Sequence, residues 1–218
     1  MLGKMALKNV AHDMGRVLRE AGQALNILGF KAADDMSFRD HYSRHRTLMS
    51  IVDEVPSVSS SAFIAPCSAL IGDVVVADKV SVWYGAVIRG DENKVTIGSG
   101  ANVQDMVIIK TTGKHGTSIG ANVTIGHNAV LTGCEVHDTC LIGMGAVVGE
   151  GAVVEASSLV AAGAVVAPGT VVKGGQLWGG NPAKPLRDLK PAELKQLPFQ
   201  ADEYCKLAEA HIASVKLI

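Results

Sequence analysis

The sequence has few aromatic residues, no paired cysteines and almost no net charge. Aromatic side chains make up 4% of the 218 residues, so a core must be filled mainly by Val, Ile and Ala. The formal net charge of −1 gives no bulk attraction for nucleic acid, and we expect no nucleic-acid partner. No apolar run approaches the roughly 18–20 residues of a membrane span. The four cysteines form no C-x-x-C pair, which favours a reducing compartment over a disulfide framework.

What the sequence does have is a six-residue repeat. The repeat's apolar positions are Val136, Ile142, Val148, Val154, Val160, Val166, Val172 and Trp178, and small or slender residues follow four positions later at Cys140, Ala146, Ala152, Ser158, Ala164 and Thr170. This period fits neither a helix nor a flat strand, but it fits short strands joined by corners. It predicts a left-handed parallel β-helix of roughly seven coils, the fold of hexapeptide-repeat proteins. A Val/Ala-rich sandwich is the alternative. We expect Cys140 in the core.

Three interruptions of the repeat lie between residues 84 and 136. A bulge or loop is expected at residues 89–94, and the polar run T-T-G-K-H-G at 111–116 predicts a protruding loop. A slip of one residue separates Ile125 from Val136. Loops and binding sites gather where a solenoid is interrupted, so we expect the chemistry in this part of the chain.

Residues 1–30 have the spacing of an amphipathic helix, which we expect to end at Gly29. Its apolar stripe must be covered, and three possibilities stay open. The helix packs on its own β-helix or trimer, contacts a larger assembly or a membrane surface, or is an uncleaved import peptide. Residues 31–50 are polar and basic and predict an extended connection.

The end of the β-helix is marked by the run G-G-N-P-A-K-P, since Pro182 and Pro185 cannot continue the ladder. Helical spacing returns from Asp188 to Leu217, and Pro198 is expected to break that helix in two. The predicted organisation is an N-terminal helix and extended connection (1–50), a left-handed β-helix (51–185) and a C-terminal helical segment (186–218).

Several segments together resemble one family. They are Ser81–Asp91 (S-V-W-Y-G-A-V-I-R-G-D), Asn102–Asp105 (N-V-Q-D), Ile119–His127 (I-G-A-N-V-T-I-G-H), Ile142–Val148 (I-G-M-G-A-V-V) and Gly180–Lys184 (G-N-P-A-K). The chain resembles the γ-class carbonic anhydrases. The runs G-R-V-L-R-E-A-G-Q-A-L and S-R-H-R-T-L-M near the amino terminus point to the mitochondrial branch, which is attached to respiratory complex I in plants and algae. The resemblance implies a trimer with zinc between subunits, on the matrix side of the inner membrane.

The zinc ligands implied by the resemblance are three histidines, of which this chain keeps one. The three positions hold Lys110, His127 and Thr132. An ammonium group has no lone pair to donate and a hydroxyl is a poor zinc ligand. We therefore expect no zinc at a site built wholly from this chain. His115 and His137 are nearby in sequence but match no ligand position, and they are interpreted as surface residues.

Other family positions are kept. The resemblance places Arg89 and Asp91 in a pair across the subunit interface, and Gln104 and Asp105 among the polar residues near the metal. Two interpretations of Lys110 stay open: its charge partly replaces the metal, or it turns to solvent.

The leading functional hypothesis is a γ-carbonic-anhydrase-like subunit of a homotrimer or mixed trimer, docked on complex I, with a structural role. Residues 1–30 are a candidate membrane-surface contact. One alternative is an active carbonic anhydrase in which His127 completes a zinc site with two ligands from an intact neighbour, since the family takes the second histidine from the adjacent subunit. A second alternative is a hexapeptide acyltransferase with His127 as the base.

Overall fold

The computed structural model describes residues 2–34, 46–51 and 53–215. The chain divides into two compact units, residues 1–45 and 46–218, which are described separately. Neither helix is long and apolar enough to cross a membrane, judged over the residues that are described.

The N-terminal unit contains a single described helix, α1 (Leu2–Ala32), as the sequence predicts. The expected stop at Gly29 is wrong, because the helix continues three residues further. It ends beside Asp34, whose φ of 54° is in the left-handed region, and the Ala33 N–H donates to the Gly29 carbonyl oxygen (2.9 Å). The predicted connection at 31–50 lies partly outside the described residues, at 35–45.

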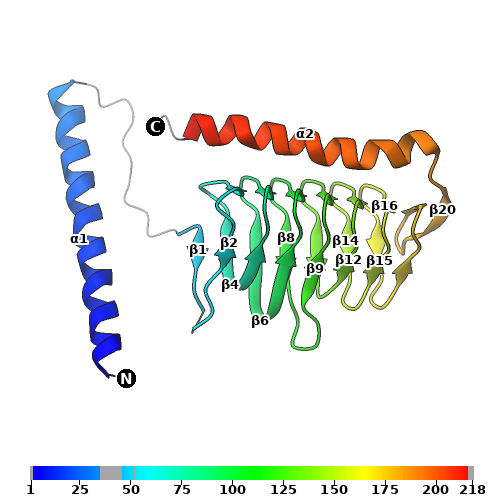
Figure 1. Ribbon diagram of the computed structural model, residues 1–218, viewed down its shortest axis with the longest axis horizontal. Coiled ribbons are helices and arrows are strands. Elements are labelled where there is room, and N and C mark those ends of the chain that lie inside the picture. The colour runs from blue at the N-terminus through cyan, green and yellow to red at the C-terminus, as the bar shows by residue number, and fades with distance from the viewer. Residues whose placement is uncertain (1, 35–45, 52, 216–218) are drawn as a thin grey trace. The chain divides into compact units, whose positions relative to one another are not determined.

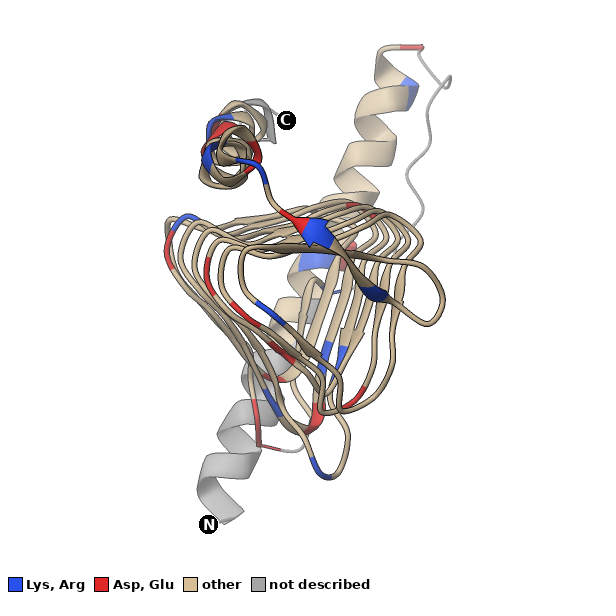
Figure 2. Cartoon of the chain, turned by 90° about the vertical axis from the view of Figure 1, so that its right-hand side faces the viewer, with Lys and Arg blue, Asp and Glu red and all other residues tan. Residues whose placement is uncertain are grey.

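The second unit is a parallel β-helix of about seven coils, so the predicted fold class is confirmed (Figure 1). Figure 2 shows the coils stacked with a rounded triangular outline. The first sheet contains β17 (Val165–Val166), β14 (Val147–Val148), β11 (Val130–Thr132), β8 (Ile108–Lys110), β6 (Val87–Ile97), β9 (Thr117–Ile119), β12 (Glu135–Val136), β15 (Val153–Val154) and β18 (Val171–Val172) in that order, with β4 (Ala69–Val76) paired to β6, β1 (Leu48–Met49) and β2 (Ser57–Val58). The second sheet contains β20 (Lys184–Asp188), β19 (Gln176–Gly179), β16 (Leu159–Val160), β13 (Leu141–Ile142), β10 (Thr124–Ile125), β7 (Asn102–Val103), β5 (Ser81–Val82) and β3 (Phe63–Ile64).

The core lies inside the coils and follows the hexads. All eight apolar positions of the repeat are buried, and so are its small positions with the exception of the half-buried Thr170. Cys140 is in the core as predicted, where burial raises the pKa of its thiol. The four cysteines are free thiols. Each coil therefore buries its apolar positions against the next coil, which is what stabilises a solenoid.

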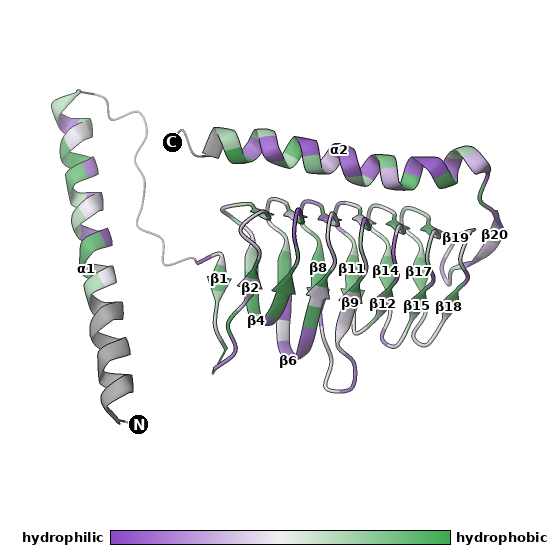
Figure 3. Ribbon diagram, in the orientation of Figure 1, coloured by the Kyte–Doolittle hydropathy of each residue, from purple (hydrophilic) through white to green (hydrophobic). Residues whose placement is uncertain are grey.

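The three interruptions have different structures. At residues 89–94 the chain stays in strand β6, where Gly72 pairs with Gly90 and Val74 with Val95, so Asp73 alone faces four residues. This is the bulge that was expected, and the alternative of a loop is wrong. The loop at 111–116 between β8 and β9 is confirmed. The one-residue slip falls at the short corner between β11 and β12, where Gly133 has a φ of 51°. Hydrophilic residues gather at the bend of β6, whereas hydrophobic residues recur along the strands (Figure 3).

The parallel ladder ends at the last coil, as expected, but the chain then forms one more strand, which was not expected. Pro185 is part of strand β20, which pairs antiparallel with β19 at the edge of the sheet. The parallel ladder does stop there, but Pro185 does not prevent a strand, because an edge strand tolerates a missing N–H donor.

The C-terminal helix α2 (Pro191–Val215) is continuous, so the predicted break at Pro198 is wrong. A proline removes one helical hydrogen bond, and this loss is offset because Leu197 and Ala201 on either side are buried. Glu193 accepts the Lys190 N–H (2.8 Å) and an ion pair from Arg187 (2.7 Å), which stabilises the first turn. Figure 1 shows α2 returning along the β-helix, over strands β3, β5, β7 and β10.

Candidate functional site

Two of the three ligand positions implied by the resemblance lie side by side on one face of the β-helix. Lys110 at the end of β8 is in register with Thr132 at the end of β11, and on its other side with Arg89 of β6. The residues before them, Ile88, Ile109 and Leu131, point into the core and are fully buried. Because side chains alternate along a strand, Arg89, Lys110 and Thr132 form one outward row.

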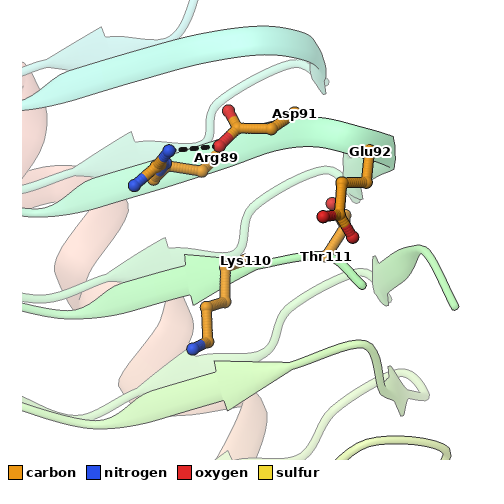
Figure 4. Close-up of a pocket in the computed structure, with 5 residues that line it drawn as sticks. All are labelled: Arg89, Asp91, Glu92, Lys110 and Thr111. Atoms are coloured by element: carbon orange, nitrogen blue, oxygen red, sulfur yellow. Dashed lines mark ion pairs between the residues drawn. The ribbon is translucent and has the colours of Figure 1, made fainter. Parts of the chain in front are cut away.

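An open pocket of about 260 Å³ lies along this row, lined by Arg89, Asp91, Glu92, Lys110 and Thr111. Arg89 forms an ion pair with Asp91 inside the same chain (Figure 4). The ammonium group of Lys110 extends away from Asp91 and Glu92 and has no ion-pair partner among the described residues. Pairing of Arg89 and Asp91 across a subunit interface stays a prediction.

His127 lies at the corner between β10 and β11, and Asp105 determines its tautomer. The Nδ1 atom is 2.9 Å from Asp105 Oδ2, and the backbone N–H of His127 donates to Gln104 Oε1 (3.2 Å). An ionised carboxylate only accepts hydrogen bonds, so Nδ1 carries the proton and Nε2 holds the lone pair of the neutral ring. Nε2 has no partner within the described part of the chain, and 34% of the side chain is exposed.

A row of polar side chains supports this corner from one coil to the next. Asp105 also accepts the Tyr84 N–H through Oδ1 (3.1 Å). Gln104 donates from Nε2 to Asn102 Oδ1 (3.2 Å), and Asn102 donates from Nδ2 to Thr124 Oγ1 (2.9 Å). Asn102, Gln104 and Thr124 are all buried. Gln104 and Asp105, which were expected near the site, therefore act on His127 directly.

Helix α2 also reaches this corner, through contacts that no sequence pattern predicts. Tyr84 Oη is 2.9 Å from His211 Nδ1, and Trp83 packs edge-on against the His211 and Tyr204 rings, with centroids 5.0 Å and 5.7 Å apart. Burial, and then the charge of Asp105, raise the pKa of Tyr204. Nothing in the local sequence signals a contact between residues 84 and 211.

His115 and His137 stay apart from these positions. His115 lines a separate pocket of about 230 Å³ with Lys114, Glu135 and Gly151, and His137 lies 4.0 Å from Glu135 with both side chains exposed. Among the residues that are described, no group of three His, Cys, Asp or Glu side chains is arranged to hold a metal.

The resemblance implies zinc, and the donor set of one chain does not fit it. Lys110 and Thr132 occupy adjacent ladder positions and offer an ammonium and a hydroxyl, while His127 is at the other end of strand β11. A catalytic zinc ion takes three protein ligands, from neutral imidazole nitrogen, thiolate sulfur or carboxylate oxygen, in addition to its open position. His127 alone fits, because its Nε2 is free and its Nδ1 is held by a carboxylate, as in many metal-binding histidines.

The fold and this corner define a hexapeptide-repeat β-helix protein. No protein-family model matches the chain. It is 53% identical over 206 residues to gamma carbonic anhydrase 3, mitochondrial, of Arabidopsis thaliana, covering 92% of this chain and 80% of the relative. It is 47% identical over 208 residues to gamma carbonic anhydrase 1, mitochondrial, of the same plant, covering 93% and 76%. The chain belongs to the γ-carbonic anhydrase family.

Solved structures agree on the fold. A hexapeptide transferase family protein from Anaplasma phagocytophilum superposes with a TM-score of 0.73 at 40% sequence identity, covering 75% of this chain and 97% of that one. The chain is more similar in sequence to the named γ-carbonic anhydrases than to this hexapeptide transferase family protein, so the acyltransferase alternative is not favoured.

Proposed function

We propose that this chain is a γ-carbonic-anhydrase-like subunit with a structural role, whose own zinc site is degenerate. The observation that carries the proposal is the ladder pairing of Lys110 with Thr132. Two positions that the resemblance assigns to histidine ligands are adjacent here but hold a lysine and a threonine, which supports a site that has lost its ligands. A scaffold needs the arrangement, whereas a zinc enzyme also needs the imidazoles.

The proposed assembly is a trimer with homologous subunits, in mitochondria, attached to the matrix side of complex I. Both relatives are named as mitochondrial proteins, which supports the location. Helix α1 supports attachment to something larger, because its apolar residues Met14, Leu18, Leu25 and Leu28 are each at least 60% exposed. An apolar stripe of this kind is typically covered by a partner or a membrane surface.

A second function is supported by the geometry of His127. In a mixed trimer, His127 would supply one neutral imidazole to a site whose other two ligands come from a neighbour that keeps both histidines. Asp105 already holds the tautomer that this role needs. A zinc ion bound there would supply the activation of water that hydration of carbon dioxide requires.

The test is metal content together with oligomeric state. The chain is purified alone, and also together with a homologous subunit that has histidine at all three positions; zinc is measured by plasma mass spectrometry and mass by light scattering. We expect a zinc-free trimer without carbon dioxide hydration above background for the chain alone. Zinc and activity in that homotrimer would refute the structural role, and a monomer would refute the trimer. Zinc in the mixed trimer, lost on His127→Ala, would establish the shared site.

The attachment to complex I is tested through α1. We expect the pair of substitutions Leu18→Gln and Leu25→Gln to release the trimer from complex I on native gels while its circular dichroism stays unchanged. The matched control is Gln23→Ala with Asn26→Ala on the polar side of the same helix, which should stay attached. Equal behaviour of both pairs would rule out the apolar stripe as the contact.

A further inference from the structure

The ammonium group of Lys110 is exposed and has no protein acceptor among the residues that the structure describes. Its inward neighbour Ile109 is fully buried, and its own side chain is exposed beside Arg89, whose charge is paired with Asp91. No acceptor for the Lys110 ammonium group is present among the described residues, and Figure 4 shows it directed away from the acidic side chains of the pocket. An ammonium group has three N–H donors and no acceptor, so a contact that buries it must supply a lone pair.

Nε2 of His127 is an acceptor that no donor reaches from the described part of the chain. The proton on Nδ1 is held by Asp105, so the lone pair of Nε2 points away from the carboxylate. The ring is held at Nδ1 by Asp105, whose other oxygen accepts the Tyr84 N–H, and the backbone N–H of His127 donates to Gln104. The carboxylate behind the ring also makes this corner attractive to a cation.

Lys110 and His127 of one chain do not contact each other in the part of the chain that the structure describes. Strands β8 and β11 are neighbours on one face, with His127 at the corner before β11 and Lys110 and Thr132 at the far ends of the two strands. A turn at His127 and Asn128 and then strand β11 separate His127 from Thr132, and no hydrogen bond or ion pair joins Lys110 to His127 in the described part of the chain. The donor and the acceptor are therefore at opposite edges of one face.

Donor and acceptor at opposite edges of one face are complementary in a head-to-tail contact, which closes into a ring when the rotation allows it. We infer that in the trimer Lys110 of one subunit donates a hydrogen bond from Nζ to Nε2 of His127 of the partner subunit, in place of a metal ion. This inference rests on the proposed function, since it needs the trimer. Thr132 beside Lys110 adds a neutral hydroxyl and no second charge. The ammonium group of Lys110 is therefore the cation that would contact the His127–Asp105 pair of the adjacent subunit.

The ammonium group fits this position better than a second imidazole would without metal. Two neutral imidazoles held by carboxylates would present two lone pairs to each other, whereas the lysine presents a donor and a charge. Charge-assisted hydrogen bonds are the stronger class, and removing one partner leaves the other buried and unsatisfied. The two residues should therefore be coupled in trimer stability.

The experiment compares trimer dissociation, measured by sedimentation or mass photometry on dilution of the full-length chain. We expect Lys110→Met to raise the concentration at which the trimer dissociates by at least about ten-fold. The matched control is Lys114→Met, the same change of charge in the exposed loop nearby, which should have little effect. His127→Phe should weaken the trimer as well. In the double variant with Lys110→Met, the loss of trimer stability should be smaller than the sum of the losses in the two single variants.

The outcomes separate this inference from the proposed function. A wild-type chain that is monomeric at all concentrations contradicts the proposed trimer. A stable trimer in which Lys110→Met equals Lys114→Met, with additive effects in the double variant, refutes the Lys110–His127 contact and leaves the trimer standing. If a variant fails to fold, a crystal structure of the wild-type trimer decides, because Nζ and Nε2 more than about 3.5 Å apart exclude the hydrogen bond.

Discussion

The regular coils from Val136 to Trp178 and the interrupted coils from Tyr84 to Val136 have the same core but different polar residues. In both regions the inward apolar side chains are buried, Ile109 as fully as Ile142. The interrupted coils also bury Asn102, Gln104, Thr117 and Thr124, whereas in the regular coils Ser158 is the buried polar residue among those described. Interruption thus leaves the packing intact and adds a polar support for the His127 corner.

The comparison also shows where chemistry is possible in such a fold. A hexad coil presents only its corners and its outward strand positions to a partner. The register of β6 with β8 places Arg89 next to Lys110, the bulge that follows carries its ion-pair partner Asp91, and the corner before β11 places His127 on Asp105. The regular coils lack an equivalent arrangement among the residues described, which is consistent with a supporting role.

The largest effect is expected from restoring the two missing imidazoles. Lys110→His with Thr132→His places two imidazoles on register neighbours, and with His127 of an adjacent subunit they form a complete three-histidine set. We expect zinc to rise from near zero to about one ion per interface in plasma mass spectrometry of the trimer.

The matched control for zinc belongs to the regular coils. Val147→His with Val165→His also pairs two outward register neighbours, and it should bind no zinc, because the next residues in that row, Val130 and Ile108, offer no third ligand. The double variant at Lys110 and Thr132 could also fold and form a trimer but stay zinc-free. The backbone of the site would then differ from that of the zinc-binding relatives.

A smaller effect tests whether the two regions are packed equally well. Ile142→Ala in the regular coils and Ile109→Ala in the interrupted coils should each lower the free energy of unfolding by about 2–5 kcal/mol, because both side chains are fully buried. Urea denaturation followed by circular dichroism measures this. Met144→Ala, at an exposed position, should change it by less than about 0.5 kcal/mol. If Ile109→Ala lowered the free energy of unfolding much less than Ile142→Ala, the interruptions would have loosened the core.

The smallest effect concerns the end of the regular coils, where α2 begins. The hydrogen bond from Arg187, then the Lys190 N–H, lower the pKa of Glu193 from its ordinary 4.5 to about 2. A carboxyl group with a lowered pKa in the folded state stabilises the protein above about pH 4.5, and this stabilisation is lost as the pH falls to about 2. Glu193→Gln should therefore slightly lower the melting temperature at pH 7 but not at pH 2.

The exposed Glu209 of the same helix provides the control for Glu193. Glu209→Gln should leave the melting temperature nearly unchanged at both pH values. A difference between Glu193→Gln and wild type that persists unchanged to pH 2 would contradict the assigned ion pair.

Most of the fold could be predicted from the hexads, because each residue's inward or outward direction depends on its place in a six-residue unit. The exceptions have local causes. Gly29 did not end α1, since glycine only weakens a helix, and Pro198 did not break α2, since burial on both sides of it outweighs one lost hydrogen bond. In the site, Lys110, His127 and Thr132 could be selected through the family resemblance, but their mutual placement could not.

By itself, the sequence determined the β-helix, its register and the chemistry of the ligand positions, because each of these depends on residue identity at a fixed spacing. Only the tertiary structure decided that Asp105 holds His127, one coil away, and that Tyr84 meets His211 across 127 residues. Such contacts depend on how coils stack and on the path by which α2 returns. No local period in the chain specifies them.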